Sequence, residues 1–238
     1  MIINLISGPR NISTALMYAF AQREDTVVMD EPFYGHYLVN HDVQHPGRKE
    51  IIATMPHTFE GVLERIETKS KEAEHIFLKN MGHHLIDIDI SFMNGWCNIF
   101  LIRDPKQLIA SFAQVIPDPT IQDIGLKRQA ELFELLRKQN GTAPIVIDSN
   151  LVLANPELML TRLCKAIDIA FESTMLTWEP GVQVVDVPWA KYWYKNVQAS
   201  SGFAKQKTSN RPLPERCQAL YQVALPYYNL LVAHAISI

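Results

Sequence analysis

A short stretch near the start of the chain, residues 7–14, combines a glycine, a basic side chain and hydroxyl groups, which are residue types that bind anions. It follows a short apolar run and precedes a run with helical spacing, so we predict that it links a strand to a helix. Gly8 lets the backbone approach a ligand closely. The loop amides and the helix N-terminus would face one spot, where Arg10, Ser13 and Thr14 add donors. The stretch therefore predicts a phosphate-type anion site, although an ordinary strand-to-helix turn has the same outline.

This loop is not a Walker A motif. Ser13 follows Gly8 by five residues, at the point where a Walker A loop has Gly-Lys. The ligand that this loop binds therefore has to be inferred from the rest of the chain.

Charged residues follow two other predicted strands at the points where those strands end. Asp30 and Glu31 follow the second strand, and Lys79 follows the third. The carboxyl ends of strands are where function gathers in a parallel α/β sheet. The acidic pair therefore suggests a reactive site, with helix capping as the alternative. Lys79 can meet a phosphate or sulfuryl oxygen, with a surface salt bridge as the alternative.

Aromatic and imidazole side chains lie close to these charges. Phe33, Tyr34, His36 and Tyr37 directly follow the acidic pair, which suits a small-molecule pocket, although each aromatic is as readily explained as part of the core. After Lys79 come His83 and His84. Adjacent residues are not expected to face the same way, so at most one of these two histidines is expected to function.

A second basic element lies in the middle of the chain. Arg103 ends the fourth predicted strand, and Ser111 lies eight residues later, two turns into the next helix. Both side chains could converge on one phosphate, with Arg103 making charge-assisted bonds. Residues 200–211 are polar and basic, which is typical of a loop that closes over an anion and equally of a solvated surface loop.

The elements that must position these residues alternate between strand and helix up to residue 170. Apolar runs predict strands, and amphipathic or capped runs predict helices. The expected strands are residues 2–6, 26–29, 76–78, 98–102 and 144–147, and helices are expected at 15–20, 59–73, 123–139, 156–167 and 215–235. This alternation predicts an α/β fold with an open, doubly wound parallel sheet flanked by helices. Residues 40–56 are predicted to be a loop or lid, and 171–214 a less regular segment.

Composition limits the class of protein. The chain has 238 residues, is 47% hydrophobic and carries a formal charge of −3, which fits one α/β domain over residues 1–238 and argues against general nucleic-acid binding. Three widely spaced cysteines form no metal-ligand pattern. No apolar run approaches the length of a membrane span, and no signal-like N-terminus is evident, so we predict a cytoplasmic location.

Taken in order, four stretches resemble the sulfotransferase family, whose members transfer a sulfuryl group from 3′-phosphoadenosine 5′-phosphosulfate (PAPS). Residues 7–14 resemble the loop that binds the 5′-phosphosulfate. Residues 102–111 resemble the element whose arginine and serine hold the 3′-phosphate. Residues 145–181 are similar to the later strand-helix segment, and residues 200–203, with the basic residues after them, to the closing loop.

The resemblance implies a P-loop nucleotide-kinase-like fold with PAPS as co-substrate and no metal. The residues that it assigns to PAPS are Gly8, Pro9, Arg10, Asn11, Ile12, Ser13, Thr14, Arg103, Ser111, Lys205, Lys207 and Arg211. Two departures stand out. Asn11 and Ile12 replace the commoner Ser-Gly, so Ile12 would narrow or redirect the loop, and Asp148 follows the fifth strand near where the family often has an adenine-contacting aromatic residue.

The implied reaction needs a base that takes a proton from a hydroxyl or amine acceptor. Resemblance to carbohydrate-type members favours Glu31, and the small-molecule branch points to His83; we favour Glu31. Arg10 and Lys79 would stabilise charge on the sulfuryl and leaving oxygens. Phe33, Tyr34, His36 and Tyr37 would line the pocket for a small-molecule or carbohydrate acceptor.

Two other functions remain open from the sequence: a P-loop nucleotide-dependent kinase, and a non-catalytic nucleotide-binding protein. A homo-oligomer is also possible, with the aromatic segment 178–194 as its partner surface.

Overall fold

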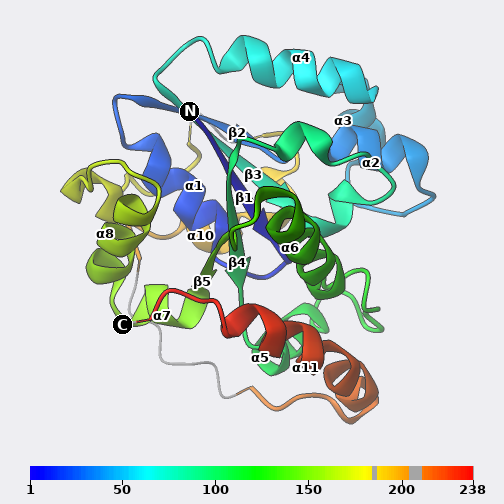
Figure 1. The fold of residues 1–238 in the computed structure, drawn as a ribbon. Helices are drawn as coiled ribbons and strands as arrows, with labels where there is room; N and C mark the ends of the chain where they lie inside the picture. Colours follow the sequence, from blue (N-terminus) through cyan, green and yellow to red (C-terminus); the bar gives the residue numbers. More distant parts are fainter. Residues whose placement is uncertain (184–186, 204–210, 238) are drawn as a thin grey trace.

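A single parallel sheet organises the molecule (Figure 1). The computed structural model describes residues 1–183, 187–203 and 211–237. The sheet has five strands in the order β2-β3-β1-β4-β5, and all neighbouring pairs are parallel. The strands are β1 (Ile2–Ser7), β2 (Thr26–Asp30), β3 (His75–Met81), β4 (Cys97–Ile102) and β5 (Ile145–Asp148). The predicted fold class is confirmed, since each strand arises from an apolar run of the sequence.

The central strand β1 is buried along almost its whole length, as a strand between two neighbours must be. Its one amide side chain, Asn4, is satisfied across the sheet. Asn4 donates to Asn98 over 2.9 Å and accepts from Asn80 over 2.8 Å. This buried amide chain ties β3, β1 and β4 together, because an unpaired amide in the core would be costly.

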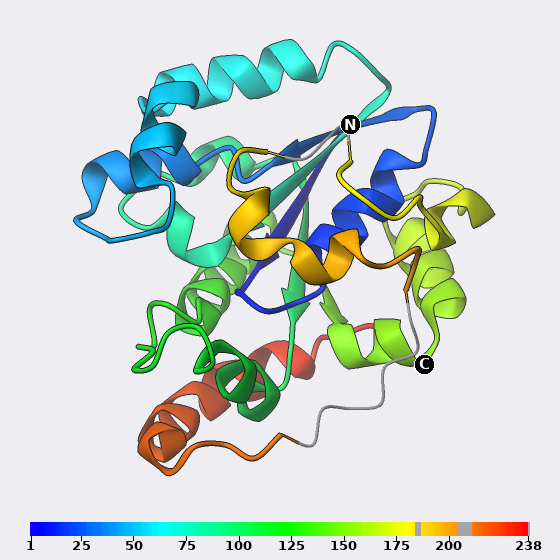
Figure 2. The ribbon, with the colours of Figure 1, turned by 180° about the vertical axis from the view of Figure 1, so that it is seen from behind.

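Helices cover both faces of the sheet (Figures 1 and 2). Helices α1 (Ser13–Ala21) and α8 (Pro156–Ala166) pack with one core cluster, which includes Leu16 and Leu163. Helices α6 (Leu126–Asn140) and α11 (Gln218–Val232) pack with a second cluster, which includes Phe133 and Leu231. The sheet is thus doubly wound, with the carboxyl ends of its strands along one edge of the core.

Local signals set several helix ends. Asp104 caps helix α5 (Pro105–Phe112), and Asn155 caps α8 through the Leu158 amide at 3.2 Å. Gly141 ends α6 in the left-handed conformation, as predicted. The other helices are α2 (Tyr34–Asn40), α4 (Phe59–Lys69), α7 (Ser149–Ala154), α9 (Ala190–Trp193), α10 (Lys195–Gln198) and the 3₁₀ helices η1 (Gly82–Leu85), η2 (Ser91–Met93), η3 (Ser173–Leu176) and η4 (Glu215–Cys217).

The predicted loop or lid at residues 40–56 is wrong in part, because helix α3 (Arg48–Thr54) lies within it. Gly47 turns the chain into this helix with φ 77°. The fully buried Ile51 anchors the helix in a cluster with Tyr34 and Trp189. Trp189 is distant in sequence, so the anchoring contact carried no local signal.

The less regular segment at residues 171–214 contains only short helices among its described residues, as expected. Three of its aromatic side chains are buried: Trp178, Trp189 and Tyr194 are each at most 4% exposed, whereas Tyr192 is 45% exposed. The segment packs these three onto the rest of the chain because their large apolar area is best removed from water. A partner surface on this segment stays a prediction.

A helix that crosses a membrane must be both long enough and apolar enough to span the hydrocarbon core. Among the described residues, no helix meets both requirements.

Candidate active site

The predicted anion loop lies between β1 and α1, at the centre of the sheet's carboxyl edge. Helix α1 begins at Ser13, and no side chain of the described residues caps it, so its first amides stay available to a ligand. A Cβ on Gly8 would lie 2.6 Å from the carbonyl oxygen of Ile124, which explains the glycine. The amide of Gln129, a fully buried residue of α6, donates to the carbonyls of Ile6 and Leu101 at 3.0 Å each. Gln129 therefore ties the end of β1, which leads into the loop, to the neighbouring strand β4.

The two residues that depart from the family pattern are accommodated within this loop. The side chain of Asn11 accepts from the amide of Ile12 at 3.0 Å and donates to the carbonyl of Leu101 at 3.2 Å. The side chain of Ile12 packs against the core cluster around α1. The Ile12 amide is thus already bonded, which leaves anion binding to the amides that follow it.

Basic side chains gather beside the loop. Arg10 has a left-handed backbone with φ 54°, and its Nε donates to Ser111 Oγ at 3.2 Å. Arg103 donates to the carbonyl oxygen of Arg10. Burial lowers the pKa of both arginines, and repulsion from Arg211 lowers each further. Arginines that repel one another around a hydroxyl are suited to an anion, which would relieve that repulsion.

The structure therefore brings together Arg10, Ser111 and Arg103, with Arg211 near enough to repel the two other arginines. The predicted residues Lys205 and Lys207 lie outside the described residues.

The acidic pair lies further along the same edge, on the neighbouring strands. Asp30 and Lys79 are register partners on β2 and β3. The Nζ of Lys79 donates to Asp30 Oδ1 at 2.8 Å and to Glu31 Oε1 at 2.6 Å. The three side chains are 0–7% exposed. Lys79 is therefore part of a buried ion-pair cluster, and the alternative of a surface salt bridge is wrong.

Glu31 adopts a left-handed backbone, with φ 44°, that a side chain of its size rarely adopts. Its amide donates to the carbonyl of Lys79 at 2.7 Å, and its carbonyl accepts from the amide of Tyr34 at 2.9 Å. These bonds hold the strained turn that aims the carboxylate at Lys79. Conformations of this kind concentrate at functional sites.

Burial and neighbouring charges shift the pKa values of Glu31 and Lys79. Burial raises the pKa of Glu31 to about 7, the negative charge of Asp30 adds to the rise, and Lys79 opposes it. The pKa of Lys79 is raised because the attraction of Asp30 and Glu31 outweighs its burial. Glu31 can therefore exchange a proton near neutral pH, as a general base must.

Sequence reasoning missed a fourth member of this cluster, Tyr194, which follows α9. Its hydroxyl donates to Asp30 Oδ2 and accepts from Lys79 Nζ at 2.7 Å. Thr14, at the start of α1, lies close enough to this hydroxyl to oppose the rise of its pKa. Tyr194 thus joins the acidic cluster to the anion loop. Its only sequence signal was membership of an aromatic segment.

The two histidines occupy one cluster instead of opposite faces, because residues of the 3₁₀ helix η1 do not alternate as in a strand. Their rings lie 4.4 Å apart, and both are buried. His84, not the predicted His83, lies nearest the base, with its Nδ1 3.7 Å from Glu31 Oε2. Burial lowers the pKa of His83 to about 3 and that of His84 well below its usual value. Both imidazoles are therefore neutral at pH 7.

The four predicted acceptor-pocket residues do not line one common pocket. Tyr34 stacks on His84 at 4.4 Å, and Tyr37 contacts the same ring at 4.9 Å. Phe33 lies fully buried in the core against Phe92, and His36 turns toward the carbonyl of His57 at 3.0 Å. Of the four, the two tyrosines contact His84, whose Nδ1 lies 3.7 Å from Glu31.

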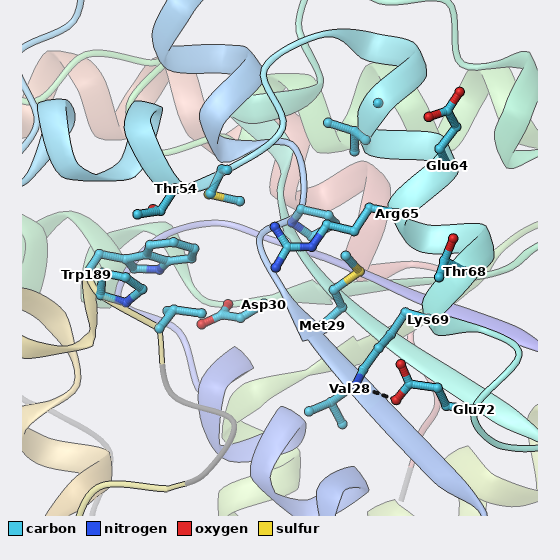
Figure 3. A pocket seen from close by; sticks show the side chains of 16 residues that line it. Val28, Met29, Asp30, Thr54, Glu64, Arg65, Thr68, Lys69, Glu72 and Trp189 are labelled. Atoms are coloured by element: carbon cyan, nitrogen blue, oxygen red, sulfur yellow. Dashed lines mark hydrogen bonds and ion pairs between the residues drawn. The ribbon is translucent and has the colours of Figure 1, made fainter.

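A groove of about 790 Å³ lies between β2 and α4, where Arg65 points in from the helix and Trp189 closes one end (Figure 3). The groove reaches Asp30, whose side chain has no exposed surface. None of the four predicted acceptor-pocket residues, all of which are described, lines it.

Comparison with solved structures supports the fold. The chain is similar to the "Sulfotransferase Domain from the Curacin Biosynthetic Pathway", with a TM-score of 0.58, 13% identity and coverage of 95% of this chain and 97% of that one. It is also similar to the "Sulfotransferase from Alicyclobacillus acidocaldarius", with a TM-score of 0.56, 9% identity and coverage of 98% and 95%. At such identities the likeness concerns the fold alone.

Two curated relatives from Arabidopsis thaliana are closer in sequence. "Branched-chain-amino-acid aminotransferase-like protein 1" is 35% identical over 234 residues, and protein 2 of that name is 32% identical. The match covers 98% of this chain and 42% of each relative, so this chain spans less than half of their length.

The sequence also matches the family described as "Sulfotransferase domain" over residues 1–235, which is nearly the whole chain. That match agrees with the order of the strands and with the solved structures of the same fold. The chain therefore belongs to the sulfotransferase family.

Proposed function

We propose that this chain transfers a sulfuryl group from PAPS to a hydroxyl or amine of a small-molecule or carbohydrate acceptor. The observation that carries the proposal is the connection through Tyr194. Its hydroxyl bonds to the Asp30–Lys79 pair beside Glu31, and it lies near enough to Thr14 of the anion loop for that side chain to affect its pKa. A group-transfer site needs an anion cradle and a proton acceptor side by side, and this connection supports such an arrangement.

Two anion subsites favour PAPS over a nucleoside triphosphate. The amides at the start of α1 would hold the 5′-phosphosulfate. Arg103 and Ser111, joined through Arg10, would hold the 3′-phosphate. Ser13 stands where a Walker A loop has Gly-Lys, so the kinase alternative finds less support. Lys205, Lys207 and Arg211 are further proposed contacts to the 3′-phosphate.

The proposed reaction is an in-line displacement at sulfur. A lone pair of the acceptor oxygen or nitrogen forms the new bond to sulfur, and the bond from sulfur to the bridging phosphate oxygen breaks with its electron pair leaving on that oxygen. Glu31 takes the acceptor's proton, for which its pKa of about 7 is suited. Arg10 stabilises the negative charge that builds on the leaving oxygens.

Lys79 would act on the reaction indirectly, through Glu31, because its ammonium already bonds to three oxygens of the protein. We propose that it orients the base and keeps a buried carboxylate ionisable, because a nearby ammonium favours the charged form. His83, which lies beyond His84 from Glu31 and has a pKa of about 3, finds less support as the base.

Calorimetry with 3′-phosphoadenosine 5′-phosphate tests the donor. We expect binding that is tighter than that of adenosine 5′-phosphate, since the latter lacks the 3′-phosphate. Equal binding of the two, or none, would contradict PAPS as donor. Transfer of labelled sulfate from PAPS to a panel of hydroxyl and amine acceptors then tests turnover. Tight nucleotide binding with no transfer to any acceptor would favour the non-catalytic alternative.

A further inference from the structure

We propose that Tyr194 is a positioning residue of this active site: its hydroxyl keeps Asp30 the ionised member of the carboxylate pair and so leaves Glu31 as the member that accepts the proton. The inference rests on the proposed function, in which Glu31 is the base. It assigns a role to a residue that reaches the site from an otherwise irregular segment, 164 positions away from Asp30 along the chain.

The hydrogen-bond directions support this role. Asp30 Oδ1 accepts from Lys79 at 2.8 Å, and Asp30 Oδ2 accepts from Tyr194. Both oxygens of Asp30 thus receive a proton donor, and donors to a carboxylate favour its charged form. Among the described residues, Glu31 has a single donor within hydrogen-bond distance, Lys79 at 2.6 Å from Oε1, and its Oε2 lies 3.7 Å from His84. When one proton is shared between the two carboxylates, it therefore belongs on Glu31.

The phenol is well placed to hold this arrangement. Tyr194 is 4% exposed, and burial raises the pKa of its hydroxyl, so it remains a donor across the working pH range. The proton it gives to Asp30 is its only one, and Lys79 donates to its oxygen. The orientation of this single hydroxyl is fixed by two partners on the neighbouring strands β2 and β3.

Within the described part of the chain, no neutral donor comparable to Tyr194 hydrogen-bonds to Glu31. The titratable groups that face it are Asp30 on β2, Lys79 on β3, His84 on η1, Tyr34 on α2 and Tyr194 after α9. His84 is neutral because of its burial, and the hydroxyl of Tyr34 bonds to His45 Nδ1 at 2.8 Å. Tyr194 is thus the neutral side chain that distinguishes Asp30 from Glu31.

The test follows the protonation of Glu31 directly, without turnover. The infrared band of a protonated carboxyl group is recorded against pH, and the part that Glu31→Gln removes is assigned to Glu31. In Tyr194→Phe we expect the midpoint of this band to fall by about one pH unit, because Asp30 then competes for the shared proton. The acid limb of the pH–rate profile should move in the same direction.

Two controls separate this role from a structural one. Tyr192→Phe makes the same change two residues earlier, on a side chain that is 45% exposed, and should leave the midpoint in place. In an Asp30→Asn background, Tyr194→Phe should cause no further shift, since the charge that it protects is gone. An unchanged midpoint in Tyr194→Phe, or the same shift with and without Asp30, would overturn the proposal.

A second measurement covers the case in which Tyr194→Phe fails to fold. In the unaltered protein, the hydroxyl proton between Tyr194 and Asp30 should give a slowly exchanging, far-downfield NMR signal that Asp30→Asn removes. Absence of this signal would contradict the hydrogen bond itself. Calorimetry with the bisphosphate nucleotide reports on the proposed function separately, because neither the infrared midpoint nor the proton signal needs nucleotide.

Discussion

The Nζ of Lys79 lies 2.6 Å from Oε1 of Glu31, in a position where the lysine is 1% exposed and the carboxylate 7%. A lysine so deeply buried keeps its charge only with partners, and here the same ammonium also bonds to Asp30. Two carboxylates around one ammonium leave an excess negative charge in the interior. Glu31, with its raised pKa, is where a proton relieves it.

Glu31→Gln removes the proposed base and keeps the shape of the side chain. We expect kcat for sulfuryl transfer to fall by about 10²–10⁴-fold, since general base catalysis contributes on that order. Binding of 3′-phosphoadenosine 5′-phosphate should be nearly unchanged, because Glu31 lies outside the anion loop. Glu24→Gln, an exposed residue before β2, serves as the control. An unaltered rate in Glu31→Gln would remove Glu31 as the base.

The pH dependence of activity follows from the ionisation of Glu31. A base must be ionised to accept a proton, and the pKa of Glu31 is raised by burial to about 7. We therefore expect kcat/KM to rise as the pH increases through about 7 and to level off above it. Rates measured from pH 5 to 9 check this. A profile that stays flat from pH 5 to 8 would contradict the assignment.

The same shift predicts a pH dependence of stability with a definite sign. The pKa of Glu31 is about 7 in the folded protein and 4.5 ordinarily, so the folded state binds a proton more tightly than the unfolded state. Its contribution to the unfolding free energy is complete below about pH 4.5 and is lost as the pH rises through about 7. Urea unfolding of the unaltered protein and Glu31→Gln should show a difference that changes across this window. A constant difference would mean that Glu31 is not shifted.

Removal of Lys79 tests the buried cluster itself. Lys79→Met leaves Asp30 and Glu31 without their shared ammonium, and we expect a loss of about 3 kcal/mol in the free energy of unfolding at pH 8. Lys69→Met breaks an exposed pair with Glu72 and should cost less than about 1 kcal/mol. Equal losses in the two variants, measured by urea unfolding, would show that the cluster does not stabilise the fold.

Arg103→Ala tests the second anion subsite. We expect it to weaken binding of 3′-phosphoadenosine 5′-phosphate by about 10–100-fold, the effect of losing a charge-assisted hydrogen bond. Binding of adenosine 5′-phosphate should change much less, because it has no 3′-phosphate. Arg137→Ala, on an exposed position of α6, is the control. A similar loss for both nucleotides would place Arg103 elsewhere in the site, for example as a support of the loop through the carbonyl of Arg10.

The features that local sequence predicted are those that depend on neighbours along the chain. The five strands follow from apolar runs, and the turn at Gly8 and the caps at Asn155 and Gly141 follow from residue type. The placement of Glu31 directly after β2 also followed, since the carboxyl ends of parallel strands share one edge. Lys79 was predicted to follow its strand, whereas it lies within β3, which continues to Met81. The roles of the individual site residues remain predictions.

Features that depend on distant partners were not predicted. Helix α3 is held through Ile51 by aromatic residues that include Trp189, and Lys79 is buried by contacts with Tyr194, 115 residues away. The choice of His84 over His83 as the neighbour of Glu31 depends on the local 3₁₀ geometry. For helix α3 and for Lys79, the deciding contact is between segments whose spacing in the sequence carries no periodic signal.

The sequence by itself determined a parallel α/β fold with an anion loop after the first strand, because apolar periodicity and turn residues act over a few positions. Only the tertiary structure decided how the charges pair. It buries Lys79 between Asp30 and Glu31 and brings Tyr194 across to Thr14. The physical reason is that the energy of a charge depends on what surrounds it in space, and burial raises the pKa of Glu31 to about 7 although Lys79 opposes the rise.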